Sequence, residues 1–239
     1  MPLTFAHPAA ILPGYHWQKR GVPFAALIIG SMSPDFEYFL RLEPIGHFAH
    51  TIPGIFVFCL PMGLLAYGLY RTLLSSVLPA LMPLMIRSRW PESALTGGWI
   101  KQYGAVSIAL VLGALTHIVW DSFTHHSGIA VAYFPVLGAE VQGVPTYKIL
   151  QHGSTLLGLL LIARWYCRLP VQEVVPQEGV SGKVYLLIAF AFVVFATILG
   201  YIHPPVTIGR VVVETIDSAL LAVLTVSLWI RYRPKKSNE

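Results

Sequence analysis

The sequence predicts an all-α protein, a polytopic transmembrane helical bundle with about five to six spans and a re-entrant or interfacial segment. Two observations lead to this prediction. Of the 239 residues, 55% are hydrophobic and 11% are charged, whereas soluble domains carry about 25% charged residues. Several apolar runs also reach the length of about 20 residues that a helix needs to cross a bilayer. This composition does not fit an ordinary soluble globular protein.

The apolar runs give the expected helices in chain order. Six runs are candidate spans: 22–40, 52–70, 103–120, 149–163, 184–202 and 211–230. The first is marginal because two acids lie near its end. The run at 73–86 is short and contains two prolines, so we expect it to be interfacial or re-entrant. The sequence contains no evident repeat or second domain, and we expect a single membrane domain over residues 1–239.

Basic residues flank these runs in four clusters. They precede the first run, fill the connection between the second and third, flank the connection after the fourth, and form the tail. Because basic loops stay in the cytoplasm, we expect a protein integral to the cytoplasmic (inner) membrane with a cytoplasmic C-terminus. This orientation also explains the net charge of +5, so we expect no nucleic-acid partner. The sequence leaves the oligomeric state open.

The most informative polar residues are His117, Asp121 and His125. They lie four residues apart, about one helical turn, so they would line one face of a helix that otherwise looks membrane-spanning. Imidazoles and carboxylates are costly inside a bilayer and usually have a role there. Both groups are also metal ligands. The stripe therefore predicts a metal site near the outer face, and the alternative is a polar helix end that meets water.

Further candidate ligands lie near the ends of other spans. Asp35 is a candidate ligand and Glu37 a second ligand or a general base, although acids here could also cap a helix. His47 and His50 lie three residues apart before a span, and His50 is the stronger candidate of the two. His152, at the mouth of another span, is a weaker candidate ligand.

Two acids interrupt the last apolar run. Glu214 lies one turn from Arg210, so a local ion pair near the interface could explain it. Asp217 is less easily explained in this way, and acids within a membrane span are functional candidates by default. If Asp217 faced the His117 site from deeper in the membrane, an ion or proton pathway would become the better interpretation.

At these residues the chain resembles bacterial membrane-bound metal-dependent hydrolases. It is more closely similar to an uncharacterised branch, a domain-of-unknown-function family, whose members begin with Phe-x-His-Pro-Ala. That motif is found here at Phe5-Ala6-His7-Pro8-Ala9. The group's Pro-Asp-x-Asp, paired-histidine and Ser-His-x-x-x-Asp elements resemble Pro34 to Glu37, His47 to Thr51 and Thr116 to Asp121. A more distant similarity is to zinc-dependent phospholipase C.

The resemblance covers roughly residues 1–160, the metal-site motif region, and leaves two additional transmembrane helices at 184–230 without a motif. It implies a divalent metal site used for hydrolysis and adds His7 to the ligands, beside Asp35 and His117. Six spans would put His7 on the cytoplasmic side, away from the other ligands. A re-entrant half-helix at 22–40 would remove this conflict and leave the N-terminus outside.

Together, these features predict a membrane-embedded metal-dependent hydrolase. It would act on a phosphoester or lipid-type substrate at the outer membrane face through metal-activated water. The expected metal ligands are His7, Asp35, His50, His117, Asp121 and His152. Glu37 or His125 would serve as general base or orient a ligand. Zinc is the expected ion, with Mn²⁺ and Fe²⁺ as alternatives, and a membrane lipid or lipid-linked molecule the expected partner. The alternative function is non-enzymatic: an ion or proton pathway, or a metal-stabilised structural component.

Overall fold

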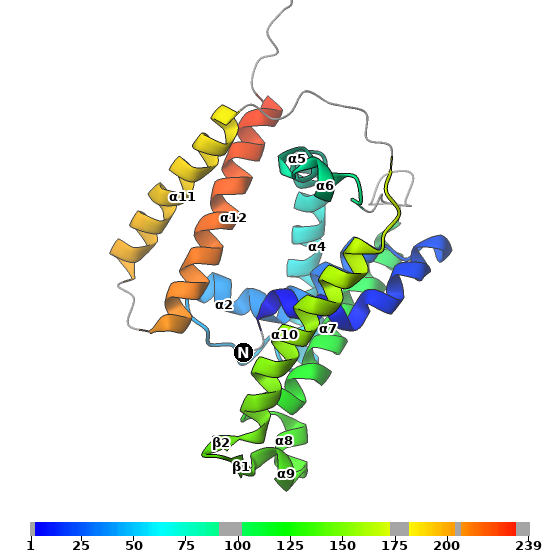
Figure 1. The fold of residues 1–239 in the computed structure, drawn as a ribbon, viewed down its shortest axis with the longest axis vertical. Helices are drawn as coiled ribbons and strands as arrows, with labels where there is room; N and C mark the ends of the chain where they lie inside the picture. The colour runs from blue at the N-terminus through cyan, green and yellow to red at the C-terminus, as the bar shows by residue number, and fades with distance from the viewer. Residues whose placement is uncertain (1–2, 91–101, 173–181, 204–206, 233–239) are drawn as a thin grey trace, which may run out of the picture. The chain divides into compact units, whose positions relative to one another are not determined.

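The computed structural model describes residues 3–90, 102–172, 182–203 and 207–232, and it confirms the all-α fold (Figure 1). The strands of this described part form one antiparallel hairpin, β1 (Glu140–Val141) and β2 (Val144–Pro145). In chain order the helices are η1 (Thr4–Arg20), α1 (Phe24–Met32), η2 (Ser33–Asp35), α2 (Phe36–Arg41), α3 (Ile52–Gly54), η3 (Ile55–Cys59), α4 (Leu60–Leu69), η4 (Tyr70–Leu74), α5 (Ser75–Leu81), α6 (Leu84–Arg87), α7 (Tyr103–Thr124), α8 (Ile129–Tyr133), α9 (Pro135–Gly138), α10 (Thr146–Cys167), α11 (Gly182–Ile202) and α12 (Ile208–Tyr232).

Four helical stretches of the described chain are long and apolar enough to cross a membrane. They are Ile52–Leu81, Tyr103–Tyr133, Gly182–Ile202 and Ile208–Tyr232. Each contains one of the runs predicted as spans at 52–70, 103–120, 184–202 and 211–230. The stretch from Ile52 stays helical through two wider π-helical segments, η3 and η4. A membrane protein follows from these four helices, in agreement with the composition.

The other predicted runs have more particular structures. The run at 22–40 is not one continuous helix, because α1 ends at Met32 and a short 3₁₀ segment containing Pro34 separates it from α2. The run at 149–163 lies inside α10, which is not among the four candidate spans. The run at 73–86 is divided between α5 and α6, because the backbone is extended at Met82, immediately before Pro83.

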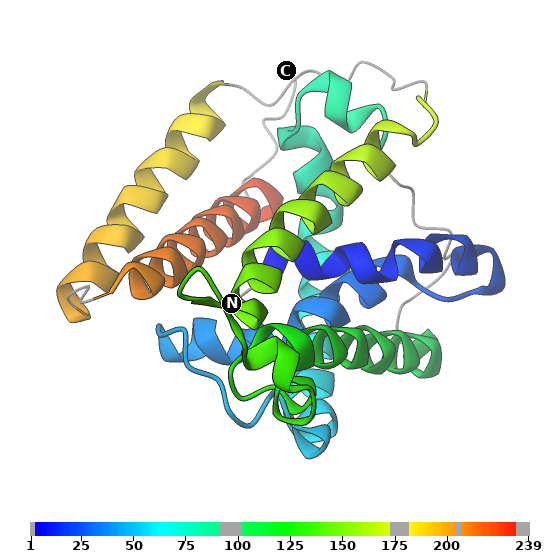
Figure 2. The same cartoon turned by 60° about the horizontal axis from the view of Figure 1, so that its bottom comes forward.

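The described chain forms two compact units. The first is drawn from Met1–Phe36, Gly46–Tyr67 and Pro91–Pro170, and the second from Glu37–Ile45, Gly68–Trp90 and Val171–Glu239. In the second unit, α11 and α12 run side by side (Figure 2), and Arg210 at the start of α12 forms an ion pair with Glu43. These two helices occupy the region predicted at 184–230.

The core of the first unit is the crossing of α1 and α7. Their backbones approach closely at two glycines, because a Cβ atom on Gly30 would lie 2.3 Å from the Leu110 carbonyl oxygen, and one on Gly113 would lie 2.4 Å from that of Leu27. The 3₁₀ helix η1 packs against α1, α7 and α10 (Figure 1), and α10 also contacts α7. This packing carries the chain from α1 into Ser33–Asp35 directly beside the polar face of α7.

Candidate metal centre

Four ligand atoms from three segments of the first unit form a closed ring. On α7, the His117 Nε2 atom lies 3.2 Å from Asp121 Oδ2, and it also lies 3.5 Å from Asp35 Oδ1. His50, in the turn before α3, completes the ring, with its Nε2 atom 3.4 Å from Asp35 Oδ1 and 3.6 Å from Asp121 Oδ2. Imidazole and carboxylate therefore alternate around the ring.

The spacing of this ring fits a metal ion. In a tetrahedral zinc site with bonds of about 2.0–2.1 Å, neighbouring ligand atoms lie about 3.3 Å apart. The four sides of the ring measure 3.2 to 3.6 Å. They are longer than the 2.7–2.9 Å that is typical of a charge-assisted N–H···O hydrogen bond. Sides of this length suit ligands of one ion, and the atoms that all lie within 4.8 Å of one another belong to three residues at a time, such as Asp35, His50 and His117.

Neighbouring groups orient two of these ligands. The Nδ1 atom of His117 lies 2.7 Å from the Ser31 carbonyl oxygen, to which it donates, so the lone pair of Nε2 points toward the ring. The Thr4 hydroxyl donates to Asp35 Oδ2 over 2.6 Å, which leaves Oδ1 for the ring. Histidines that bind metals usually donate their second ring N–H to a carbonyl or carboxylate in this way.

His7 extends the centre from η1. Its ring stacks on that of His117 with centroids 3.6 Å apart, and its Nε2 atom lies 3.5 Å from Asp121 Oδ1. Burial and the neighbouring His117 lower the pKa of His7 from 6.5 to about 3, so its imidazole is neutral at pH 7 and can offer a lone pair. Two overlapping groups could therefore hold a metal ion: His7, His117 and Asp121, and Asp35, His50 and His117.

The centre is buried and its polar atoms are incompletely satisfied. The side chains of His117 and Asp35 are 0% and 1% exposed. Burial alone would raise the pKa of Asp35, but His117 and His50 beside it hold that pKa below its usual range. Within the described chain, His7 Nδ1 and Nε2, His117 Nε2 and Asp121 Oδ1 make no hydrogen bond. Such groups are costly to bury without a hydrogen bond, and a divalent cation would satisfy one nitrogen of His7 together with ligand atoms of His117 and Asp121.

His125 connects the centre to its surroundings. It caps the C-terminus of α7, and its Nδ1 atom lies 3.4 Å from Asp121 Oδ1. Its Nε2 atom lies 3.5 Å from the amide nitrogen of Gln151 on α10. The His125 side chain is 23% exposed and that of His50 is 18% exposed, so these two histidines form the accessible edge of the centre.

Comparison with known proteins places the chain in a family. Residues 1–228 match the family described as a domain of unknown function (DUF4184). The chain belongs to this family. No curated protein and no solved structure matches it. Membership of DUF4184 agrees with the expected uncharacterised family, and it extends beyond the 1–160 region in which motifs were recognised.

In this DUF4184 chain the structure brings together five of the six residues predicted as metal ligands. It brings His7 beside Asp121 and His117, as the resemblance implied. The six-span topology would have put His7 on the other side of the membrane. The sixth, His152, is exposed and belongs to neither group that could hold a metal. Its neighbour Gln151 is buried and reaches His125 instead. In the sequence, Gln151 gave no signal of this role beside the stronger candidate His152.

The remaining candidates have other surroundings. Glu37, predicted as a general base, is buried in the second unit, where Arg41 donates two hydrogen bonds to its Oε1 atom. Its catalytic role therefore stays a prediction. His47 is exposed, and His126 is exposed with its ring edge-on to Tyr147. Neither belongs to the groups that could hold a metal.

Replacing Thr4 with valine tests the support of Asp35. Thr4→Val removes the hydroxyl that donates to Asp35 Oδ2 and keeps the shape of the side chain. Loss of a partner that orients a ligand typically weakens metal affinity about 10- to 100-fold. We expect that loss in a competition titration with a fluorescent zinc chelator. Thr72→Val, which removes an exposed bond to the Gly68 carbonyl, is the control and should leave the affinity unchanged. Equal affinities in both variants would contradict this role of Thr4.

Proposed function

We propose that this protein is a membrane-embedded metal-dependent hydrolase that acts on a phosphoester or lipid-type substrate at the outer membrane face. The observation that carries the proposal is the ring of His117, Asp35, His50 and Asp121, with sides of 3.2 to 3.6 Å. Each of the two overlapping groups of three His and Asp ligands leaves a coordination position for water, which is the arrangement of catalytic rather than structural zinc sites.

Asp35, His50 and His117 would hold the ion, and His7, His117 and Asp121 form the overlapping group that could hold it instead. Imidazole combined with carboxylate favours zinc, and Mn²⁺ or Fe²⁺ are the alternatives. When bound, the ion would supply an activated water whose pKa falls to about 7 and would polarise a phosphoryl oxygen. The protein fixes the ligands beforehand through the Ser31 carbonyl and the Thr4 hydroxyl.

His125 is the proposed general base. It lies against Asp121 Oδ1 and is more exposed than the buried ligands, so it can exchange a proton between the centre and solvent. The contact between its Nε2 atom and the Gln151 amide holds the ring in place. Glu37 is the alternative base, although its pairing with Arg41 opposes that role.

The orientation in the membrane completes the proposal. If α10 crosses the membrane together with the four candidate spans, the three basic clusters after residue 70 all lie on the cytoplasmic side, which leaves the centre toward the outer face of the cytoplasmic membrane with the C-terminus inside. A substrate that reaches a centre at this level of a membrane helix is amphiphilic, so a membrane lipid or a lipid-linked phosphoester fits best.

Metal content tests the proposal directly. We expect stoichiometric zinc, manganese or iron in detergent-purified protein by elemental analysis, and its loss in Asp121→Ala. Asp217→Ala is the matched control, because Asp217 is also 7% exposed but lies in α12 of the second unit. The proposal is wrong if the wild type holds no stoichiometric metal after purification without chelator and after metal is added back. In that case the histidines and acids would be hydrogen-bonded to one another.

The second candidate function is non-enzymatic, and one observation favours it. Glu214 and Asp217 on α12 are buried, and in the described chain Glu214 Oε1 and Asp217 Oδ2 make no hydrogen bond. Acids of this kind within a membrane helix are typical of ion or proton pathways. A protein that binds metal but hydrolyses no phosphoester, and that carries zinc or protons into vesicles in a manner dependent on Asp217, would favour this alternative.

A further inference from the structure

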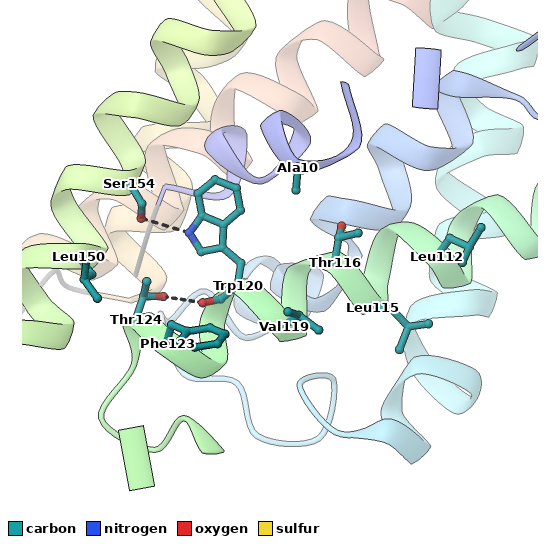
Figure 3. A pocket seen from close by; sticks show the side chains of 10 residues that line it. All are labelled: Ala10, Leu112, Leu115, Thr116, Val119, Trp120, Phe123, Thr124, Leu150 and Ser154. Carbon is teal, nitrogen blue, oxygen red and sulfur yellow. Dashed lines mark hydrogen bonds between the residues drawn. The ribbon is translucent and has the colours of Figure 1, made fainter. Parts of the chain in front are cut away.

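The first unit contains a cavity of about 680 Å³ that is open on one side and lined by residues of η1, α7 and α10 (Figure 3). Its lining is almost entirely apolar and includes Ala10, Leu112, Leu115, Val119, Phe123 and Leu150. Pockets that hold small ligands have volumes of about 300–1,000 Å³. The cavity is therefore large enough for a ligand, and its composition decides which kind.

The polar groups of the lining are already engaged within the protein. The hydroxyls of Thr116, Thr124 and Ser154 donate to backbone carbonyls of their own helices, and the Trp120 indole N–H donates to Ser154 Oγ over 3.1 Å (Figure 3). A polar ligand would lose its bonds to water without gaining replacements here. The ligand that suits this lining is a hydrocarbon chain.

The length of the cavity fits one leaflet of a bilayer. The lining residues on α7 run from Leu112 to Thr124, over which the helix rises about 18 Å. The hydrocarbon core of a bilayer is about 30 Å thick, so one leaflet accounts for about 15 Å. Because α7 belongs to a candidate membrane span, the cavity can exchange chains with surrounding lipid.

The cavity also adjoins the metal centre. Trp120, one of its walls, meets the His7 ring edge-on with centroids 5.7 Å apart, and His7 in turn stacks on His117. The Thr124 end of the cavity meets the accessible edge of the centre, because Thr124 Oγ1 lies 3.3 Å from His125 Nδ1. A molecule with its chain in the cavity therefore has its polar head beside His125.

We propose that this cavity binds the hydrocarbon chain of the substrate and that the substrate is a lipid phosphoester with a long chain in the outer leaflet. The inference rests on the proposed function for the hydrolysis of the phosphoester. The binding of the hydrocarbon chain is inferred from the cavity alone. The proposed substrate is therefore a lipid phosphoester and not a water-soluble one. A water-soluble phosphoester has no hydrocarbon chain to bury and would gain no binding energy from this apolar site.

Photolabelling tests the chain site without requiring activity. The full-length protein is reconstituted in phosphatidylcholine vesicles that contain a phosphatidylcholine with a diazirine in mid-chain, irradiated, and mapped by mass spectrometry. We expect label to be enriched at residues 112–124 and 150 over Phe190, an exposed residue of the candidate span α11. Label spread equally over both sites would reveal ordinary lipid contact and overturn the proposal.

A filled cavity provides the matched variant. Ala10→Trp places a large side chain in the cavity from an exposed position, so the fold should persist. We expect a several-fold loss of label at residues 112–124, unchanged label at Phe190 and unchanged metal content. Leu186→Trp, on an exposed face of α11, should leave all three unchanged. Undiminished label at residues 112–124 in Ala10→Trp would overturn the chain site.

The two proposals can fail separately. With metal bound, Ala10→Trp should raise the KM for a long-chain lipid phosphoester and leave hydrolysis of a water-soluble phosphoester unchanged. Enriched label at residues 112–124 in a protein that holds no metal would overturn the proposed function and support the chain site. Uniform label in a protein with full metal content would overturn the chain site alone.

Discussion

His117→Ala is expected to abolish both metal binding and hydrolysis. The His117 Nε2 atom lies within 3.5 Å of both Asp35 and Asp121, and its side chain is 0% exposed, so water or another residue cannot readily replace it. Without it, Asp35 and Asp121 lose the fully buried imidazole between them and share only His50. Leaving a buried charge without its partner typically costs about 3–5 kcal/mol. Elemental analysis and phosphoester hydrolysis would both show the loss.

A more conservative variant separates loss of metal from loss of fold. His117→Gln keeps a buried amide that can still donate to the Ser31 carbonyl, so the α1–α7 contact should survive while the ligand is lost. His152→Ala replaces an exposed histidine that lies outside both metal-capable groups, and it should retain metal and activity. Full hydrolytic activity in His117→Ala would refute the metal centre as the source of catalysis.

The polar stripe on α7 could be predicted from the sequence, because residues four positions apart lie on the same face of a helix. His117 and Asp121 lie one turn apart, and the structure puts their ligand atoms 3.2 Å apart. Asp35 and His50 were expected as candidate ligands near the ends of other spans, and His7 was added through the ordered motifs of a resemblance. Spacing alone could not have joined residues so distant in the chain, because their meeting depends on how η1, η2 and the turn before α3 pack on α7.

The position of His152 outside the centre has a geometric cause. Neighbouring residues on a helix point about 100° apart, so the choice between Gln151 and His152 depends on the rotation of α10 about its axis. That helix is apolar on several sides, with Leu156, Leu157 and Leu160 exposed, so its sequence does not reveal which side faces α7. Histidine is the commoner metal ligand, so residue type favoured His152 as the candidate. The packing of α10 instead turns Gln151 toward His125.

The marginal first span shows the opposite situation, in which a local signal was correct. Pro34 and the adjacent acids indicated an interruption, and the structure ends α1 at Met32. The division of the described chain into two units had no counterpart in composition, because apolar runs continue through both. Hydrophobicity predicts that a segment enters the membrane but does not predict which helices it contacts.

Gly113→Ala is expected to destabilise the first unit and to release the metal. A Cβ atom at Gly113 would lie 2.4 Å from the Leu27 carbonyl oxygen and 2.5 Å from the Ser31 backbone nitrogen, and a clash with backbone cannot be relieved by a rotamer change. Helix α1 must therefore move away from α7. Overpacking of this kind typically costs about 1–3 kcal/mol. We expect a lower midpoint of thermal unfolding in detergent.

The same displacement reaches the metal centre, because Ser31 holds His117 through its carbonyl and Asp35 follows four residues later. Gly104→Ala makes the same change in α7, at a position where no described atom lies within 4 Å of the added Cβ. Since alanine favours a helix over glycine by about 0.8–1.0 kcal/mol, that control should be as stable as the wild type or slightly more so, with full metal content. If Gly113→Ala matched Gly104→Ala in both measurements, the close crossing of α1 and α7 would not be what positions the ligands.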